Sequence, residues 1–386
     1  MPHPGGPDPG RLCRRLAGLV GFPTVNPPGR EAEAATWLGE ELAGFGCRIA
    51  YQEVAPGRLN LVAILDNGPG PSLALCSHLD VVPAGDGWSG DPFTLRSDGD
   101  RLVGRGACDA KGSIAAMVEA IALLAGQRES WSGRLTGVFV ADEEVGSTGA
   151  KWFAGHDPGI DRVVIGEPTD LVTISAHKGC LRPTIRVIGR MAHSGRPELG
   201  DNAIVKAGRL VARFAAEDAR LRRRQHPLVG PASLSVTRIA GGLADNIVPP
   251  ACQLTIDRRM LPGEGAATVE PEIRTILAEA LREDGIEAEI LGFSSTAGPS
   301  ETPSDDVIVR AAIAACTGQG IAPPGPAGFL GGCDLVHFQQ VGIRGVVLGP
   351  GSLAQAHQPN EWVRAADLAR ATLIYRDLAL RFFAGG

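Results

Sequence analysis

The stretch GVFVADEEVGS, residues 137–147, joins an apolar strand to three consecutive acids. Val138–Val140 has the continuous apolar character of a strand that is buried on both faces of a sheet. The acids Asp142, Glu143 and Glu144 follow it, and adjacent carboxylates at the end of a buried strand repel one another and lose hydration. A purely structural purpose is hard to assign to them unless a cation lies opposite. The stretch therefore predicts a sheet strand that ends at a cation-binding site.

Strands of the same kind alternate with helical patterns through the first half of the chain. Apolar runs occupy residues 59–65, 72–78, 136–142 and 162–167, and helical patterns occupy 31–45 and 112–126. Continuous apolar strands interleaved with helices are typical of a mixed α/β sheet covered on both faces. Such sheets bind ligands at the C-terminal ends of their strands, which is where the acids and histidines fall.

The pattern changes after residue 178. Segments 181–190, 232–242 and 253–261 alternate polar and apolar residues as half-exposed antiparallel strands do, with helical patterns at about 201–220 and 268–284. The α/β rhythm returns with a helix at 305–317, a strand at 345–348 and a closing helix at 364–383. We therefore expect one α/β domain, residues 1–178 and 293–386, interrupted by an inserted α+β domain, residues 179–292.

Composition and charge argue against several classes of protein. The 386-residue chain is 44% hydrophobic and 21% charged with a net charge of −6, as in a soluble globular protein of two or more domains. The longest basic run is Arg222–Arg224, which argues against a nucleic-acid surface. No apolar run reaches the roughly 20 residues of a membrane span, and no apolar signal core is present, so we expect a cytoplasmic protein. The eight cysteines contain no CxxC pair, which argues against a disulfide framework.

His78 and Asp80 stand two residues apart at the end of the predicted strand 72–78, so both side chains point to one face. This spacing suits a carboxylate that accepts a hydrogen bond from the distal ring nitrogen of a metal-bound histidine. Alone, the pair is weak evidence and is better interpreted as an ordinary surface strand end.

Three further candidates stand at comparable places. Asp109 precedes the helix 112–126, Glu167 ends the strand 162–167, and His357 lies in a Gly/Pro-bounded loop after the strand 345–348. Asp109 alone could be a helix N-cap. Together the candidates are two imidazoles and three carboxylates, namely His78, His357, Asp109, Glu144 and Glu167. This mixed N/O set suits zinc, with cobalt or manganese as alternatives, and five ligands suit two metal ions better than one.

Several longer motifs resemble, in order, the signatures of a known family. They are HLDVVPAGDGWSGDPF, DGDRLVGRGACDAKGS, ADEEVGSTGA, GEPT, AHKG, MAHSGRPELGDNAI, DNIVPPACQLTIDRRMLPGE and GPGSLAQAHQPNEWV. The chain from about Arg11 onward resembles the di-zinc peptidase/deacylase family of acetylornithine deacetylase, succinyl-diaminopimelate desuccinylase, aminoacylases and glutamate-type carboxypeptidases. GEPTD, SAHKG and the His357 motif are most similar to the acetylornithine deacetylase branch.

The resemblance implies a role for each candidate. His78 and Glu167 would hold one zinc ion, Glu144 and His357 the other, and Asp109 would bridge them. Asp80 would orient His78, and Glu143 would be the general acid/base. The implied fold is a zinc aminopeptidase-like catalytic domain with an inserted lid and dimerisation domain of ferredoxin-like type.

The lid carries the implied substrate contacts. His193 would reach across a homodimer into the partner's active site to polarise the substrate carbonyl, and Asn246 and Arg259 would bind substrate, with Arg259 holding a carboxylate. A simpler interpretation of His193 is that it caps a turn beside Ser194 and Gly195. Arg258 is the neighbour of Arg259, but in an alternating strand only one of the two faces the cleft.

The implied reaction is hydrolysis of the amide bond of an N-acyl amino acid. Glu143 would take the proton of a water that bridges the zinc ions, whose pKa falls from 15.7 to about 7 on coordination. Alternatives are a di-zinc dipeptidase or carboxypeptidase, and a desuccinylase-like enzyme. A metal-free homologue that only binds a ligand is a third, but the presence of every ligand position and of Glu143 argues against it.

Overall fold

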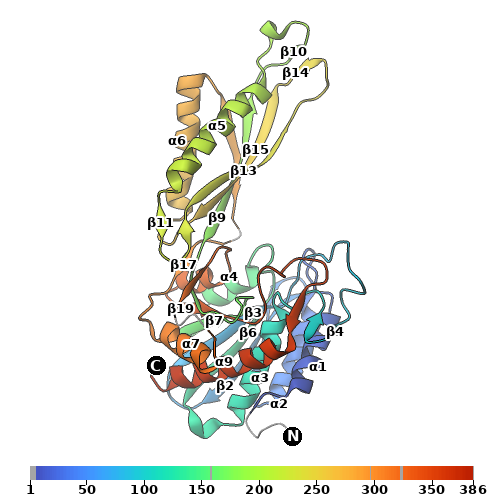
Figure 1. The fold of residues 1–386 in the computed structure, drawn as a ribbon, viewed down its shortest axis with the longest axis vertical. Coiled ribbons are helices and arrows are strands. Elements are labelled where there is room, and N and C mark those ends of the chain that lie inside the picture. The colour runs from blue at the N-terminus through green and yellow to red at the C-terminus, as the bar shows by residue number, and fades with distance from the viewer. Residues whose placement is uncertain (1–5, 157–158, 296, 322–324, 386) are drawn as a thin grey trace. The chain divides into compact units, whose positions relative to one another are not determined.

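The computed structural model describes residues 6–156, 159–295, 297–321 and 325–385, and its contacts divide the chain into two compact units (Figure 1). The first unit comprises Met1–Ser175, Thr302–Ala327 and Cys333–Gly386. The second comprises Ala176–Glu301 and Gly328–Gly332, and the expected insert 179–292 lies inside it.

A mixed sheet forms the centre of the first unit. In spatial order its strands are β1 (Arg48–Ala55), β2 (Arg58–Asn67), β6 (Gly133–Val140), β3 (Ser72–His78), β7 (Arg162–Ile165), β19 (Arg344–Val347) and β8 (Ile174–His177). The short strands β17 (Ser300–Glu301) and β18 (Ala327–Phe329), which contain residues of the second unit, both pair with β8. Strands β6, β3, β7 and β19 are parallel, whereas β1, β2 and β8 run antiparallel to their neighbours. A small sheet joins β20 (Trp362–Arg364), β5 (Arg101–Val103) and β4 (Arg96–Asp98).

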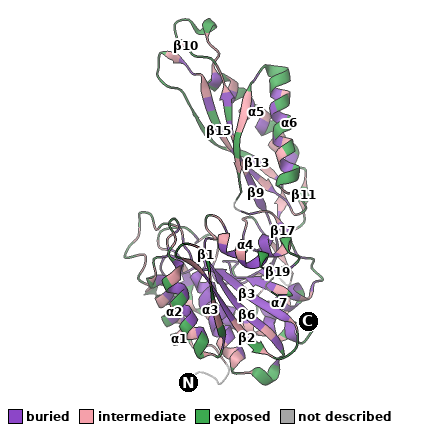
Figure 2. Cartoon of the chain, turned by 180° about the vertical axis from the view of Figure 1, so that it is seen from behind, coloured by how far each residue is buried: buried purple, intermediate pink, exposed green. Residues whose placement is uncertain are grey.

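Helices flank this sheet. They are α1 (Pro9–Gly21), α2 (Glu31–Gly44), α3 (Lys111–Ala125), α4 (Thr148–Gly155), α7 (Val307–Gly318), α8 (Leu335–Gln340) and α9 (Ala365–Phe383), with a 3-10 turn η1 (Arg128–Ser130). Apolar side chains of α1, α2, α3, α7 and α9 share one core with the strands. Strand β3 is buried along its whole length, so it appears purple in Figure 2. The predicted mixed α/β sheet is confirmed.

The second unit is an antiparallel sheet with two long helices. Its strands lie in the order β13 (Ser233–Gly241), β15 (Ala251–Met260), β9 (Gly179–Ile188) and β16 (Ala288–Ser294), with helices α5 (Ala203–Leu221) and α6 (Ala266–Asp284). Short elements are β10 (Ala192–His193), β14 (Ile247–Val248), β11 (Gln225–His226), β12 (Gly230–Pro231) and η2 (Pro197–Leu199). Phe214 of α5 and Ile273 of α6 pack with Ile185 and Leu254 of the sheet. The chain order βαββαβ and this strand order confirm the expected ferredoxin-like arrangement.

Candidate active site

Four neighbouring parallel strands end at one edge of the first unit's sheet, and the candidate residues follow them. His78 is the last residue of β3 and lies opposite Val140, the last residue of β6. Glu144 follows β6, Glu167 follows β7, and His357 lies in the loop after β19. Because parallel strands in register end at the same edge, side chains from distant parts of the sequence converge there.

The carboxylate of Asp109 lies between two imidazoles. Its Oδ1 is 3.2 Å from Nε2 of His78, and its Oδ2 is 3.3 Å from Nε2 of His357. Asp109 is not the N-cap of α3, because that helix begins at Lys111 with Ala110 as its cap residue. The peptide bond between Asp109 and Ala110 is cis.

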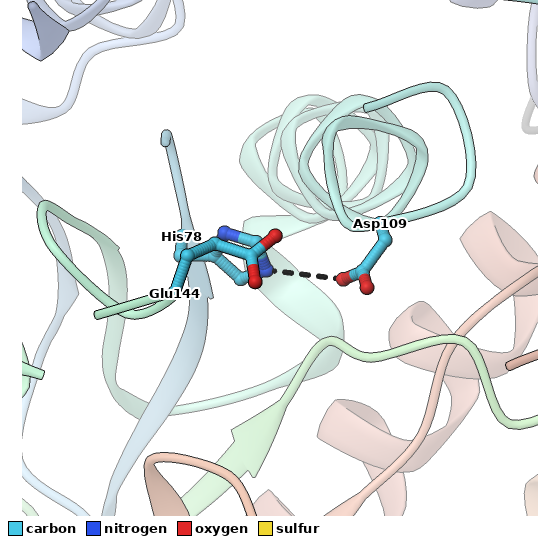
Figure 3. Close-up of side chains that lie close together, drawn as sticks. All are labelled: His78, Asp109 and Glu144. Atoms are coloured by element: carbon cyan, nitrogen blue, oxygen red, sulfur yellow. Dashed lines mark hydrogen bonds and ion pairs between the residues drawn. The ribbon is translucent and has the colours of Figure 1, made fainter. Parts of the chain in front are cut away.

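Two glutamates complete this group. An Oε atom of Glu144 is 3.1 Å from Nε2 of His357, and Oε1 of Glu167 is 3.9 Å from Nε2 of His78. One ligand atom from each of His78, Asp109 and Glu144 lies within 4.8 Å of the others (Figure 3). The side chain of His357 is 52% exposed, so this side of the group is open to solvent.

The electrostatics of the group fit a bound cation. Burial, followed by the charge of Asp109, raises the pKa of Glu167 well above its usual range despite the nearby His78. Oε1 of Glu167 is buried and has no hydrogen-bond partner among the described residues. Hydrogen bonds to Asp109 and Glu144 raise the pKa of His357 to about 10. A metal ion would satisfy the orphaned oxygen and offset the clustered negative charge, and the imidazole and carboxylate donors suit such an ion.

Glu143 differs from its neighbour Glu144. It lies outside the close trio of His78, Asp109 and Glu144, and its backbone N–H donates to Oδ1 of Asp80 at 3.0 Å. Burial and the charges of Glu167 and Asp334 raise the pKa of Glu143 well above its usual range. A half-buried carboxyl group with a raised pKa beside a metal-ligand set is a suitable proton carrier.

Asp80 contacts His78 in a different way from the one predicted. Nδ1 of His78 lies 2.9 Å from the backbone oxygen of Asp80 and 3.6 Å from its carboxylate. The carboxylate instead accepts the backbone N–H groups of Glu143 and Glu144, at 3.0 and 3.2 Å. The side-chain amide of Asn26 donates to it as well, at 2.8 Å. Asp80 thus supports the loop after β6 in addition to the histidine.

Asp142, the first of the three acids, binds groups outside the set of candidate metal ligands. Its carboxylate accepts hydrogen bonds from Asn26 and Arg58, both at 2.9 Å, and from Thr148. Its backbone adopts a positive φ of 71°, which side-chain hydrogen bonds of this kind help an aspartate to adopt. It therefore stabilises the turn that presents Glu143 and Glu144.

The residues expected to contact substrate, His193, Asn246 and Arg259, lie at two places in the second unit. His193 is exposed, pairs with Ile247 across β10 and β14, and accepts the backbone N–H of Gly195 at Nδ1, at 3.0 Å. Asn246 is its neighbour, because the N–H of Ser194 donates to the backbone oxygen of Asn246 at 2.9 Å. The turn contact considered for His193 is therefore present.

Arg259 lies far along the sheet from these two residues. It pairs with Cys180 at the start of β9, whereas Ala251 pairs with Ile188 at the end that leads to β10. Eight residues of strand correspond to about 26 Å, so a single chain does not bring Asn246 and Arg259 together. Arg259 binds Asp257 and its side chain is 33% exposed, whereas Arg258 is fully buried and paired with Glu264 and Glu272.

Several other polar residues lie around the site, and the sequence predicted no catalytic or metal-binding role for them. Asp334 is buried, burial raises its pKa to about 6, and its Oδ1 has no hydrogen-bond partner among the described residues. Glu361 is also buried and binds the backbone of Asp109. Glu361 stands four residues after His357, and that spacing was its only sequence signal. Asn26 had none.

A family model described as Peptidase family M20/M25/M40 matches residues 74–381. The chain belongs to this family. Similar relatives include acetylornithine deacetylase from Myxococcus xanthus, 34% identical over 358 residues that cover 90% of each chain. Acetylornithine deacetylase from Proteus mirabilis is 33% identical over 348 residues, which cover 86% of this chain and 84% of that protein.

Solved structures share the fold. A tripeptidase from Staphylococcus aureus superposes with a TM-score of 0.81 at 21% identity, covering 98% of this chain and 100% of that one. A dinuclear metal-binding M20 peptidase from Bacillus subtilis gives 0.74 at 20% identity, covering 97% and 98%. Together with the relatives and the ligand cluster, the family makes this protein a metallohydrolase that acts on amide bonds. None of the described helices combines the length and apolar character needed to cross a membrane.

Proposed function

We propose that the protein is a di-zinc deacylase that hydrolyses the amide bond of an N-acyl amino acid, with N-acetylornithine as the first substrate to test. The observation that carries this proposal is the Asp109 carboxylate, whose two oxygens face Nε2 of His78 and of His357 at 3.2 and 3.3 Å. A carboxylate shared by two imidazoles suits a bridge between two ions. The acetylornithine deacetylases at 33–34% identity support the substrate class.

The ligand set divides into two halves around Asp109. His78 and Glu167 would hold one zinc ion, and Glu144 and His357 the other, with cobalt or manganese as chemically acceptable replacements. Two such ions would polarise the substrate carbonyl and lower the pKa of a water molecule from 15.7 to about 7.

Glu143 would move the proton. It would accept a proton from the attacking water and deliver it to the nitrogen of the leaving amine, which breaks the amide bond. Burial and its anionic neighbours raise the pKa of Glu143, which suits a carboxyl group that alternates between acceptor and donor near neutral pH.

The lid would bind the rest of the substrate. Arg259 is partly exposed, and its planar guanidinium suits a bidentate contact with the substrate carboxylate. His193 would polarise the substrate carbonyl, and Asn246 would bind the substrate beside it. The two lie at the other end of the lid sheet from Arg259, which supports a homodimer in which the partner's His193 and Asn246 complete each site.

The surface of the lid supports this dimer. Strand β13 is an edge strand, and large apolar side chains near it and near β10 and α5 are 42–66% exposed, namely Met191, Leu199, Ile204, Val205, Ile239 and Leu243. Exposed apolar groups of this size beside an open sheet edge suit an interface with a second copy. Cytoplasmic localisation is part of the proposal, because none of the eight cysteines forms a disulfide.

A substrate screen tests the proposal. N-acetylornithine, other N-acetyl, N-succinyl and N-formyl amino acids, and simple dipeptides are each incubated with the zinc- or cobalt-loaded protein. We expect acetate release from N-acetylornithine to be the fastest reaction. Faster release of free amino acids from dipeptides would contradict the deacylase assignment and favour a dipeptidase. Faster hydrolysis of succinylated substrates would favour a desuccinylase.

A further inference from the structure

A buried carboxylate that the proposed chemistry does not use holds the loop of the bridging aspartate. Glu361 is 1% exposed, and its Oε1 accepts the backbone N–H groups of both Cys108 and Asp109, each at 2.9 Å. These two N–H groups belong to the loop that precedes α3, and they are fixed by one oxygen atom of a residue more than 250 positions away.

Arg105 keeps this carboxylate in place. Its Nη1 donates to the second oxygen of Glu361 at 2.6 Å, and the two side chains are 1% and 0% exposed. Its Nη2 donates to the backbone oxygen of Ala84 at 3.1 Å, and its guanidinium lies 5.1 Å from the centre of the Trp88 ring. Removing a carboxylate from water is unfavourable unless an opposite charge and hydrogen bonds compensate for it, and here both oxygens of Glu361 have such partners.

The same segment also carries a candidate metal ligand. Glu361 follows His357 by four residues, and its backbone oxygen accepts the N–H of Gly104 at 2.9 Å. The adjacent Asn360 accepts the backbone N–H of Ser89 at 2.9 Å. Glu361 therefore ties the loop of His357 to the loop of Asp109, so the relative position of the two ligands depends on it.

We propose that Glu361 is a positioning residue for the metal centre. By holding the backbone N–H of Asp109, it fixes the carboxylate where one oxygen faces His78 and the other faces His357. Arg105 supplies the positive charge that permits a further buried carboxylate, that of Glu361, close to an already anionic site. This inference rests on the proposed function, because it concerns the binding of the two metal ions.

Three variants of the full-length protein test this role. Glu361→Ala removes the acceptor, and Glu361→Gln keeps an oxygen for the two N–H groups but turns its amide NH₂ toward Arg105. Glu119→Ala is the matched control, because Glu119 is also fully buried and paired with two arginines, Arg11 and Arg15, at 2.5 and 3.1 Å. Stepwise zinc affinity is measured by competition with a chromophoric chelator, alongside the thermal midpoint of each metal-free protein.

We expect Glu361→Ala to weaken zinc binding by about 10- to 100-fold, as for other residues that support metal ligands, and Glu361→Gln to lie between it and the unaltered protein. Glu119→Ala should lower the thermal midpoint and leave zinc affinity unchanged. Unchanged affinity in Glu361→Ala, or an equal loss in Glu119→Ala, would overturn the role. If Glu361→Ala fails to fold, unchanged affinity in Glu361→Gln overturns it. Absence of zinc binding by the unaltered protein would overturn the proposed function as well.

Discussion

The carboxylate of Asp80 accepts the backbone N–H of Glu143 at 3.0 Å. Its other oxygen accepts the N–H of Glu144 at 3.2 Å and the side-chain amide of Asn26 at 2.8 Å. Asp80 therefore holds the proposed proton carrier and a proposed metal ligand through their backbone, in addition to contacting His78. The carboxylate of Asp80 thus stabilises the turn that carries Glu143 and Glu144, for which different roles are proposed.

Replacing Asp80 should weaken both zinc binding and catalysis. We expect Asp80→Ala to lower zinc affinity and kcat/KM by about 10- to 100-fold, because the backbone of Glu143 and Glu144 loses its acceptor. Asp80→Asn keeps one acceptor oxygen and should lose less. Zinc titration and initial rates on N-acetylornithine check both variants, and full activity in Asp80→Ala would remove this role.

Substitutions of the neighbours Arg259 and Arg258 should change different properties of the protein, substrate binding in one case and stability in the other. Arg259→Ala should raise KM for a carboxylate-bearing substrate by about 10- to 150-fold, since a charged hydrogen bond contributes about 1.5–3 kcal/mol. Arg258→Ala should lower the thermal midpoint instead, because it removes a fully buried cation from the half-buried acids Glu264 and Glu272, which then keep only Arg224 as their cation. Michaelis–Menten kinetics and thermal melts separate the two effects. An unchanged KM in Arg259→Ala would contradict its assignment.

Mixing two inactive variants tests whether His193 acts across a dimer. In a heterodimer of His193→Ala and Glu143→Ala chains, one site would contain an intact Glu143 and receive an intact His193 from the other chain. After unfolding and refolding as an equal mixture, we expect about a quarter of the original activity to return, because half of the randomly assorted dimers carry one intact site. Activity that stays at the level of the separate variants would mean that His193 does not act in trans.

The ion pairs of Asp306 should make stability depend on pH. Burial opposes ionisation, but hydrogen bonds with Arg162 lower the pKa of Asp306 below its ordinary value. A lowered folded-state pKa means that the stabilisation is complete above the unfolded pKa of about 3.9 and is lost as the pH falls through the folded value. Asp306→Asn should cost on the order of 2 kcal/mol near neutral pH. Denaturation of both proteins from neutral pH down to about pH 2 should show this difference shrinking, whereas a constant difference would contradict the ionic origin.

The convergence of the candidate ligands was predictable because it follows from local patterns. Apolar runs ending at His78, before Asp142 and at Glu167 indicated buried strands, and parallel strands end at a common edge. The helix-cap alternative for Asp109 is wrong, because α3 begins two residues later and the Asp109 carboxylate turns toward the imidazoles.

Contacts between distant segments could not be predicted in this way. Asn26 lies 54 positions from Asp80, and Glu361 lies 252 positions from Asp109, so no periodicity along the chain reports either pairing. The separation of Asn246 from Arg259 likewise depends on the pairing register of β9 and β15. Motif order placed both residues in the inserted domain but carried no information about the distance between them.

Glu143→Ala tests the central claim most directly, when zinc content and acetate release are measured side by side with the unaltered protein. The variant should keep two zinc ions, because every proposed metal ligand remains, and should lose about 10²- to 10⁴-fold in turnover of N-acetylornithine, because the proposed proton carrier is removed. A Glu143→Ala protein that retains both zinc ions and full turnover would contradict the account.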